Sequence, residues 1–413
     1  MKKIILILTA FLSIAVSKSM AEVTVNDTIL VLKNVNVLDV AKGKFIKRKS
    51  LTIMDGKIAA IGNSFKTDQP IKTIDFKGAF LMPGLIDVHV HVTSNFKNNI
   101  ENTYSHLNYF LKHGITSVRD AGGDGDALLK ASTAINAGEK SGPDVYYSSF
   151  MAGDWYYNRG QNIRKEPYTA WQQRLMPGDD LDKAMIWAKS VGVTGVKLYH
   201  SFDAQFLPLV TSAAKRNGLK VWGHTMLYPA SPVDVVKSGM EVLSHVSMLE
   251  TLRKPDTLFN RRTTTNTYRD SVVAGIDITE FCNEMKKHNA ILDATLCVSV
   301  DRDPWVLKLL KRVHQQGVKI ATGTDQIVDL KSPYPRLLDE LNYFVNDCGF
   351  TNAEAIRSAT LIAAEVIGQE KNIGSVEIGK RANLIVLKEN PLKDIAALKD
   401  IEVVIKAGKL QTN

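Results

Sequence analysis

Two histidines two positions apart are the residues of this sequence best suited to metal chemistry. His89 and His91 lie in the run 85–92, whose end alternates apolar and polar residues, and residues 82–84 form a turn signal before it. The pattern predicts a β-strand, on which residues two apart point to the same face. Two neutral imidazoles on one face can each give a lone pair to a borderline divalent metal such as zinc. The pair therefore predicts a metal site, although two solvated histidines on a strand would give the same pattern.

Four later polar residues each end a short apolar or β-branched run and precede a stretch with a helical pattern. They are Lys197, His224, His245 and Asp325. In a barrel of alternating strands and helices, the C-terminal ends of the strands carry the chemistry. Taken singly, each residue has an ordinary explanation as a solvated lysine, a core histidine or a helix cap. A lysine inside an apolar strand is the least expected of them. Taken as an ordered series with the two earlier histidines, they predict one metal-binding site.

With these residues in place, the sequence resembles the amidohydrolase superfamily of metal-dependent hydrolases. Two further segments extend the resemblance over most of the chain. Residues 114–123 are similar to the second barrel strand of the family, and residues 373–387 are similar to its C-terminal return strands. Within the superfamily, the pattern is most similar to the imidazolonepropionase-like and Xaa-Pro dipeptidase-like group.

The resemblance implies a site for two divalent metal ions. His89 and His91 would hold one ion together with Asp325, and His224 and His245 would hold the second. Zinc is the default for histidine and carboxylate ligands, although manganese, iron or cobalt also fit.

Lys197 would bridge the two ions only after a chemical change. An ammonium has no lone pair, but burial beside two cations lowers the pKa of a lysine, and the neutral amine can then capture carbon dioxide. The product is a carboxylated Lys197 with one oxygen for each ion. The family resemblance, and not the spacing, implies this modification.

The same resemblance implies a catalytic scheme. A hydroxide bridging the metals would attack the substrate carbonyl, while Asp325 would act as general base and then as general acid toward the leaving nitrogen. Tyr228, four residues after His224, would donate a hydrogen bond to the carbonyl or to a substrate carboxylate, unless it is an ordinary loop tyrosine. Related enzymes tend to carry a histidine just after the third strand, and residues 148–154 contain none. This departure leaves the exact substrate open.

The elements that must position these residues follow from alternating patterns. Between residues 85 and 371, short strands alternate with helical segments, which predicts a (β/α)8 TIM barrel. The candidate strands are 85–91, 116–120, 144–149, 195–199, 220–224, 242–246, 291–296 and 319–324. The flanking segments 22–84 and 372–413 consist of short alternating runs and predict one small β-sandwich domain. The expected fold class is α/β, a metal-dependent barrel with a β-sandwich built from both chain ends.

Residues 1–21 have the pattern of a signal peptide. Two lysines precede an apolar core at 4–16, and a small-x-small motif ends at Ala21. We expect cleavage after Ala21 and a periplasmic or secreted protein, with an uncleaved anchor as the alternative. The sequence predicts no membrane span in the mature chain, because no other stretch approaches the necessary length.

Charge and cysteine usage exclude some partners. The formal charge of +9 falls to +6 once the three lysines of the leader are removed, and no basic stripe is interleaved with aromatic residues. We therefore expect no nucleic-acid partner. The three cysteines, Cys282, Cys297 and Cys348, form no CxxC motif and are expected to be buried thiols. A homo-oligomer is compatible with the sequence, which does not determine the oligomeric state.

Two long connections, 150–180 and 250–275, follow the third and sixth predicted strands on the catalytic side. The second connection is rich in basic residues, namely Arg253, Lys254, Arg261, Arg262 and Arg269. Arginine suits carboxylates because its planar fork makes two parallel hydrogen bonds. We expect Arg253, Arg261 and Arg262, with Tyr228, to recognise the carboxylate of a small-molecule substrate. A solvated loop would explain the same composition.

The function predicted from the sequence is an exported binuclear amidohydrolase acting on dipeptides of the Xaa-Pro type or on N-acyl amino acids. A cyclic amide or lactone hydrolase similar to imidazolonepropionase is the alternative. A deaminase is less favoured, because family deaminases typically place a glutamate where Leu227 stands, three residues after His224. A catalytically silent metal-binding protein is disfavoured because the full ligand set and Asp325 are present.

Overall fold

The computed structural model describes residues 29–62, 70–93, 99–159, 168–253, 266–325 and 328–411. The predicted signal peptide and its cleavage position lie outside these ranges. Across the described ranges, no helix combines the length and the apolar character that a membrane crossing requires.

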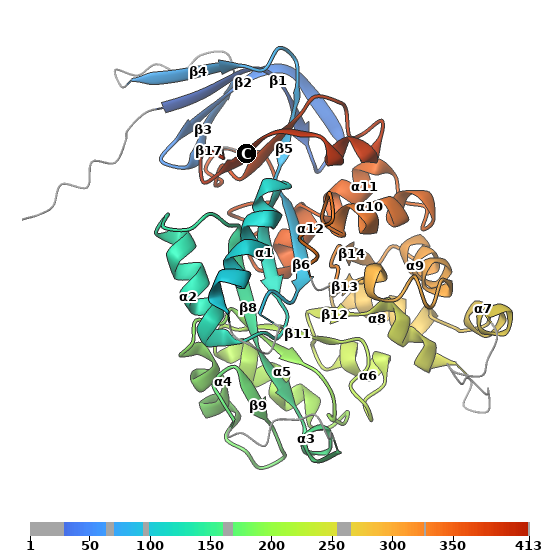
Figure 1. The fold of residues 1–413 in the computed structure, drawn as a ribbon. Helices are drawn as coiled ribbons and strands as arrows, with labels where there is room; N and C mark the ends of the chain where they lie inside the picture. Colours follow the sequence, from blue (N-terminus) through green and yellow to red (C-terminus); the bar gives the residue numbers. More distant parts are fainter. Residues whose placement is uncertain are drawn as a thin grey trace, which may run out of the picture.

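Eight parallel strands form a nearly closed barrel at the centre of the molecule (Figure 1). They are Leu85–Val90 (β6), Ile115–Asp120 (β7), Asp144–Ala152 (β8), Gly195–Leu198 (β10), Lys220–His224 (β11), Val242–Ser244 (β12), Ile291–Asp293 (β13) and Lys319–Ala321 (β14). A short strand, Gln172–Arg174 (β9), pairs with β8 outside this path. The two ends of the sheet approach each other, because the Val88 N–H donates to the Thr322 carbonyl at 3.1 Å and the Asp325 N–H donates to the His89 carbonyl at 2.8 Å. The barrel expected from the alternating pattern is confirmed.

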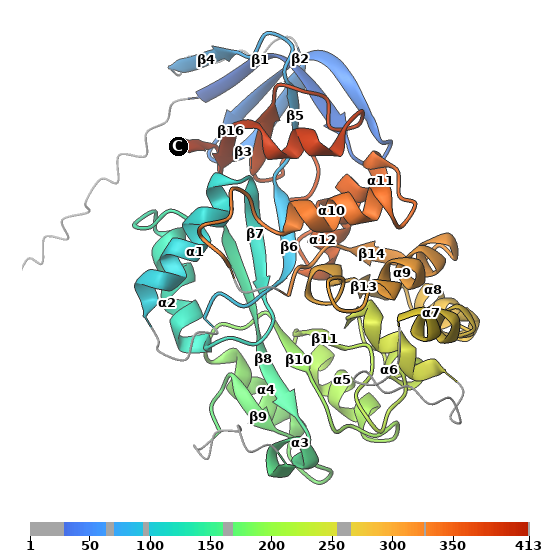
Figure 2. The same ribbon diagram turned by 45° about the vertical axis from the view of Figure 1, so that its right-hand side comes forward.

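Helices surround the barrel, with α1 and α2 on one side and α8 and α9 on the other (Figure 2). The α-helices are Ile100–Lys112 (α1), Gly125–Asn136 (α2), Asp154–Arg159 (α3), Leu181–Lys189 (α4), Leu207–Arg216 (α5), Pro232–Lys237 (α6), Asn266–Ala274 (α7), Thr279–Lys287 (α8), Trp305–Gln315 (α9), Leu337–Asn346 (α10), Asn352–Ser358 (α11) and Leu361–Val366 (α12). The 3-10 helices are Val246–Leu252 (η1), Leu296–Val298 (η2) and Ile395–Lys399 (η3). Several α-helices begin where Asn99, Asp124, Asp180 or Thr351 accepts a hydrogen bond from the first turn.

Strands from both ends of the chain form a second, mixed sheet. They are Ile29–Asp39 (β1), Lys44–Met54 (β2), Lys57–Gly62 (β3), Ile71–Asp75 (β4), Phe80–Pro83 (β5), Leu384–Leu387 (β15), Ile401–Lys406 (β16) and Lys409–Gln411 (β17). The order is β17-β16-β15-β5-β1-β2-β3, and β4 pairs with β1. The blue N-terminal strands and the red C-terminal strands therefore lie side by side in Figure 1. Asp55 and Gly56 turn β2 into β3 with φ of 50° and 73°, as a primed hairpin turn requires.

This mixed sheet packs against the N-terminal ends of the barrel strands. Asp144, at the start of β8, accepts hydrogen bonds from Lys406 Nζ at 2.6 Å and from Asn383 Nδ2 at 2.8 Å. The carboxyl ends of the barrel strands consequently point away from the sheet. Their loops are free to form a site at the opposite end, where barrels place their chemistry.

Candidate metal centre and neighbouring cavity

The end of β6 and the segment that follows β14 bring two histidines and a carboxylate together; Asp325 lies four residues beyond the last residue of β14. Asp325 Oδ1 lies 2.9 Å from His91 Nε2 and 3.3 Å from His89 Nε2. The two imidazole centroids are 5.4 Å apart. His89 lies in β6, all of whose residues are buried, and its ring contacts Asp293 and Asp325; His91 follows directly after that strand. Residues from opposite ends of the barrel sequence thus meet where the barrel closes.

His245, directly after β12, completes a compact group with His89 and Asp325. One ligand atom from each of the three residues lies within 4.8 Å of the others. The backbone of His245 has φ 76° and ψ 90°, a conformation that non-glycine residues rarely adopt. Strain of this kind persists only where the surrounding structure enforces it, and it is concentrated at functional sites.

His224 and Lys197 lie beside this group. His224 ends β11, and its ring centroid is 4.7 Å from that of His245. Lys197 is 1% exposed in β10, and its Nζ donates to Ser244 Oγ at 2.9 Å. Ser244 Oγ in turn donates at 2.9 Å to Asp293, a residue that also contacts His89. The six residues singled out in the sequence are therefore neighbours at one end of the barrel.

Burial gives this group the protonation states that a metal needs. Burial lowers the pKa of His89 and of His224 well below the ordinary value, and it lowers the pKa of His245 to about 4. These imidazoles are neutral at pH 7 and keep a lone pair available. Burial, with the Arg119 charge adding to it, also lowers the pKa of Lys197 to about 7. Neutral imidazoles around a carboxylate are a donor set that fits a divalent metal.

Asp325 remains ionised in the same surroundings. Burial opposes its charge, but the neighbouring histidines, His89 first among them, hold the pKa of this carboxyl well below its usual range. Although burial acts against it, the hydrogen bond to Asp325 raises the pKa of His91. The acid and the imidazoles form one coupled group.

Asp293, at the end of β13, is the residue of this centre that sequence reasoning missed. Its Oδ2 accepts from His89 Nδ1 at 2.7 Å and from Arg119 at 2.9 Å, and its side chain is fully buried. The bond to Nδ1 leaves His89 Nε2 directed at Asp325. The available signal was an aspartate inside the predicted strand 291–296, although the sequence did not show that the strand ends at this residue.

Two further buried carboxylates support the backbone near the candidate ligands. Asp87 accepts hydrogen bonds from the His89 N–H at 3.0 Å and from Thr324 Oγ1 at 2.9 Å. Burial raises the pKa of Asp87 to about 7. The Asp120 carboxylate accepts hydrogen bonds from the backbone N–H groups of Val92 and Gly123. These contacts hold the ends of β6 and β7 in place beside the imidazoles.

Tyr228 lines a cavity of about 480 Å³ that also touches His224. The other lining residues are Trp155, His200, Met226, Met248, Glu250 and Thr251. The segment after β8 supplies no histidine here. Instead, His200 from the end of the next barrel strand faces the cavity.

The basic residues expected at the catalytic end are not gathered in the described part of the site. Arg253 donates to the Glu250 carbonyl at 3.1 Å after η1. Arg269 is 4% exposed in α7 and pairs with Asp303 at 3.2 Å, so its charge is neutralised inside the protein. Arg261 and Arg262 lie outside the described residues, as does Lys254.

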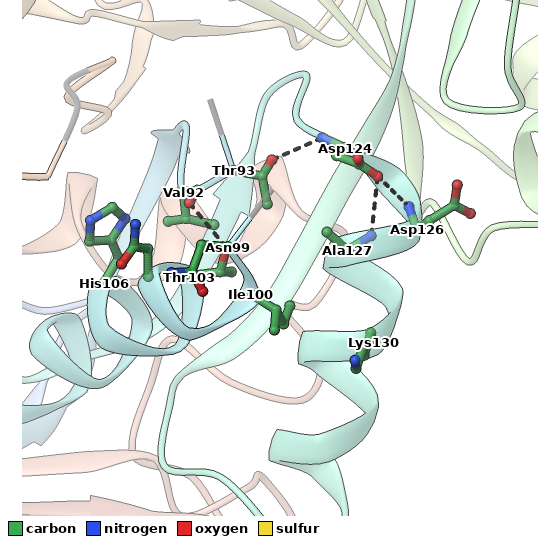
Figure 3. Close-up of a pocket in the computed structure, with 11 residues that line it drawn as sticks. Val92, Thr93, Asn99, Ile100, Thr103, His106, Asp124, Asp126, Ala127 and Lys130 are labelled. Carbon is green, nitrogen blue, oxygen red and sulfur yellow. Dashed lines mark hydrogen bonds between the residues drawn. The ribbon is translucent and has the colours of Figure 1, made fainter. Parts of the chain in front are cut away.

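A separate hollow of about 360 Å³ opens between α1 and α2 (Figure 3). The hydrogen bonds drawn there include those of a helix cap, in which the Asp124 carboxylate accepts from the Asp126 and Ala127 N–H groups, and one from Thr103 Oγ1 to the Val92 carbonyl at 3.4 Å. The Asp124 N–H donates to Thr93 Oγ1 at 2.8 Å. None of the candidate metal ligands lines this hollow. The hydrogen bonds drawn in the hollow are capping and local side-chain contacts, and the hollow lies apart from the candidate metal ligands.

Comparison with known proteins places the geometry in context. The model of the amidohydrolase family matches residues 80–410. The chain is 26% identical to the ochratoxinase of Aspergillus niger over 427 aligned residues, which cover 89% of this chain and 84% of the relative. It is 23% identical to a 5'-deoxyadenosine deaminase of Methanobrevibacter smithii over 411 residues, which cover 88% and 85% of the two chains.

Solved structures share the fold. A crystal structure of a Xaa-Pro dipeptidase with methionine bound in its active site matches with a TM-score of 0.74 at 22% identity. The match covers 93% of this chain and all of the other one. At this level of identity the likeness concerns the barrel and its accompanying sheet.

Proposed function

Given that the chain belongs to the amidohydrolase family of hydrolases that act on carbon–nitrogen bonds, we propose that it is a binuclear enzyme cleaving the amide bond of dipeptides or N-acyl amino acids. The observation that carries this proposal is the grouping of His89, His245 and Asp325 within 4.8 Å, with a buried lysine beside it. Burying a lysine and ionised carboxylates costs free energy. Binding metal ions for hydrolysis is a function that explains why the chain keeps them buried.

We propose that the candidate ligands divide into two sets, one for each metal ion. His89, His91 and Asp325 would hold one ion, and His224 and His245 would hold the other. When bound, the ions would supply an acidified water nucleophile and would polarise the scissile carbonyl. Zinc is the default metal for this ligand set.

Lys197 is proposed to bridge the two ions as a carboxylated lysine. Its pKa of about 7, caused by burial and by the charge of Arg119, supports a neutral amine that can react with carbon dioxide. Ser244 holds the amine by the hydrogen bond described above. A negatively charged carbamate would also compensate the buried positive charge of Arg119.

Asp325 is proposed as the proton carrier of the reaction. Its carboxylate is ionised, so it can accept a proton from the nucleophile and later deliver that proton to the leaving nitrogen. Asp293 would keep His89 in the tautomer whose Nε2 faces Asp325, because it takes the hydrogen bond from Nδ1. The chain thus contributes a base and a fixed orientation of its imidazoles.

The substrate proposal rests on the relatives and on the loop composition. One relative is an ochratoxinase and one matching structure is a Xaa-Pro dipeptidase, which supports an amide or peptide bond as the target. We propose that Tyr228, Arg253, Arg261 and Arg262 recognise a carboxylate on the substrate. Each cleaved substrate should therefore be compared with its C-terminal amide. Equal kcat/KM for the acid and the amide would contradict the proposed recognition of the substrate carboxylate.

The central test combines metal content with a substrate screen. The protein reconstituted with zinc should hold two ions per chain by elemental analysis, and it should release amino acids from a panel of dipeptides and N-acyl amino acids. Lactones and cyclic amides in the same panel test the alternative of a ring-opening hydrolase. Ammonia release from adenosine-type substrates tests the deaminase alternative, which a 23% identical relative favours and Leu227 disfavours. Release of ammonia without amide cleavage would contradict the proposed amide hydrolysis and support the deaminase.

We also propose that the protein is exported and cleaved after Ala21, which would place it in the periplasm or outside the cell. The support is the signal-like pattern of residues 1–21. Mass spectrometry of the protein from its native cell should find a chain starting at Glu22. A chain that retains Met1 in the cytoplasm would contradict export.

A further inference from the structure

An aromatic wall stands beside the candidate metal centre. It consists of Trp155 in α3, His200 just after β10 and Tyr228 just after β11, and it lines the cavity of about 480 Å³ that also touches His224. Residues from three different connections thus converge on one side of a space that opens next to a candidate metal ligand. We call these three residues the aromatic wall.

The rings of the aromatic wall are ordered. The Trp155 indole and the His200 imidazole are stacked, with centroids 5.0 Å apart and an interplanar angle of 14°. Tyr228 lies 6.2 Å from the first ring and 6.0 Å from the second. His200 Nδ1 is hydrogen-bonded to Ser201 Oγ at 2.7 Å, which fixes the plane of the imidazole. The three rings therefore have a defined arrangement beside the cavity.

The aromatic contacts continue from the wall to the metal centre. His200 is 6.3 Å from the Tyr156 ring, which lies 5.1 Å from Tyr199, and Tyr199 lies 4.1 Å from His224. The position of the wall is consequently tied to that of a candidate metal ligand. A group held against the wall would keep a constant distance from the reacting centre.

The wall leaves large apolar surfaces accessible to solvent. Trp155 is 46% exposed and Tyr228 is 54% exposed, although both face a cavity in which they could be covered. Met226 and Met248 line the same space, and thioether side chains adapt their shape to planar ligands. Glu250 brings a carboxylate to the lining, and none of the described lining residues is a lysine or an arginine that would attract a negatively charged occupant. A flat uncharged group is the occupant that this surface suits, because aromatic rings gain from stacking in addition to burial.

We propose that the aromatic wall recognises a planar, aromatic group on the substrate, next to the amide that is cleaved. Trp155, His200 and Tyr228 are then specificity-determining residues, and aromatic N-acyl amino acids or dipeptides are the substrate class. The inference rests on the proposed function for the identity of the cleaved bond. The preference for a flat ring does not depend on that identity.

The test compares flat and puckered rings of equal size on either side of the amide. The pairs are N-acetylphenylalanine with N-acetylcyclohexylalanine, and benzoylglycine with cyclohexanecarbonylglycine. The metal-loaded enzyme should prefer the flat member of at least one pair in kcat/KM. Trp155→Ala should reduce that preference between about twofold and tenfold, mainly by raising KM, since aromatic pairs contribute this much beyond burial. Trp155→Phe should keep most of it.

Two further variants separate stacking from other effects. His200→Phe should retain the preference and His200→Ala should lose it, because only the first keeps a ring against the indole. Trp187→Ala is the matched control, since Trp187 is a similarly exposed tryptophan, 43% exposed, that lies on α4 and does not line the cavity. It should leave the preference unchanged. A preference that is absent in the wild type, or unaffected by Trp155→Ala, would overturn the inference.

Binding without turnover distinguishes this inference from the proposed function. Calorimetry should show that phenylalanine binds more tightly than cyclohexylalanine, or benzoate more tightly than cyclohexanecarboxylate, and that Trp155→Ala removes the difference. If that order is found and no amide is cleaved, the aromatic site stands and the proposed hydrolysis fails. If amides are cleaved and neither flat probe binds better than its puckered partner, the aromatic site fails and the hydrolase stands.

Discussion

Replacing Asp293 by asparagine is the change that most directly tests how the metal centre is built. The carboxylate is fully buried and one oxygen accepts three hydrogen bonds, from His89, Arg119 and Ser244. Arg119 is itself buried, donates through Nε to the Val88 carbonyl, and lies 4.8 Å over the Trp222 ring. Asp293→Asn keeps the shape of the side chain and removes the charge that compensates Arg119.

Two effects of different size are expected. Breaking a buried ion pair by removing one partner costs about 3–5 kcal/mol, because the remaining charge is left uncompensated. Loss of a group that orients a metal-bound histidine typically lowers metal affinity about 10–100-fold. We therefore expect Asp293→Asn to reduce both the free energy of unfolding and the affinity for zinc.

A double-mutant cycle separates the two effects. Arg119→Met removes the stranded charge, so the combination Arg119→Met with Asp293→Asn should recover much of the unfolding free energy lost in Asp293→Asn alone. The zinc affinity should not recover, since His89 still lacks its carboxylate partner. Urea unfolding of the metal-free proteins measures the first quantity, and zinc titration against a competing chelator measures the second.

The control is Asp301→Asn, which neutralises an aspartate whose side chain is 80% exposed in the segment after η2. It should change neither quantity appreciably. The reasoning is wrong if Asp293→Asn binds zinc as tightly as the wild type. It is also wrong if the double variant is less stable than Asp293→Asn.

Three further changes test two other residues of the centre and one buried carboxyl of α10, Glu340, whose oxygens accept from the Leu296 and Cys297 N–H groups. Asp325→Asn should retain the fold and lower kcat by at least ~10²–10⁴-fold; near-wild-type kcat with the metals bound would contradict its role as proton carrier. Lys197→Ala should hold fewer zinc ions per chain than the wild type by elemental analysis, and an unchanged count would remove the bridging role. Burial raises the pKa of Glu340 to about 8, so the folded protein keeps a proton there that the unfolded chain releases above its ordinary value of 4.5. Stability should therefore fall as pH rises from about 4.5 to 8, and Glu340→Gln should show a weaker fall in urea unfolding measured across that window; an identical slope would show that this carboxyl is not the cause.

Local pattern was sufficient to locate most of the barrel. Alternation and β-branched runs predicted the strand 220–224 with the bounds that the structure has, and the prediction 85–91 for β6 was one residue too long. The prediction 291–296 for β13 was longer than the strand, which ends at Asp293. The chain turns there because Thr295 adopts a left-handed conformation with φ 49° before η2 begins. Such a conformation in a threonine is enforced by contacts, and residue type alone does not predict it.

The fold class and the order of the site residues could be predicted from the sequence, because each of those residues stands at or within a few residues of the C-terminal end of a strand, and the periods of strands and helices are local properties. Asp293 and Arg119 could not be assigned in this way. They act through contacts with residues 204 and 174 positions apart along the chain, and these contacts exist only once the barrel has closed. The aromatic wall is of the same kind, since its three rings come from three separate connections. Sequence alone determined which elements form and which residues stand at their ends, whereas the tertiary structure decided which side chains meet, because meeting depends on the closure of the barrel and on the loops that it brings together.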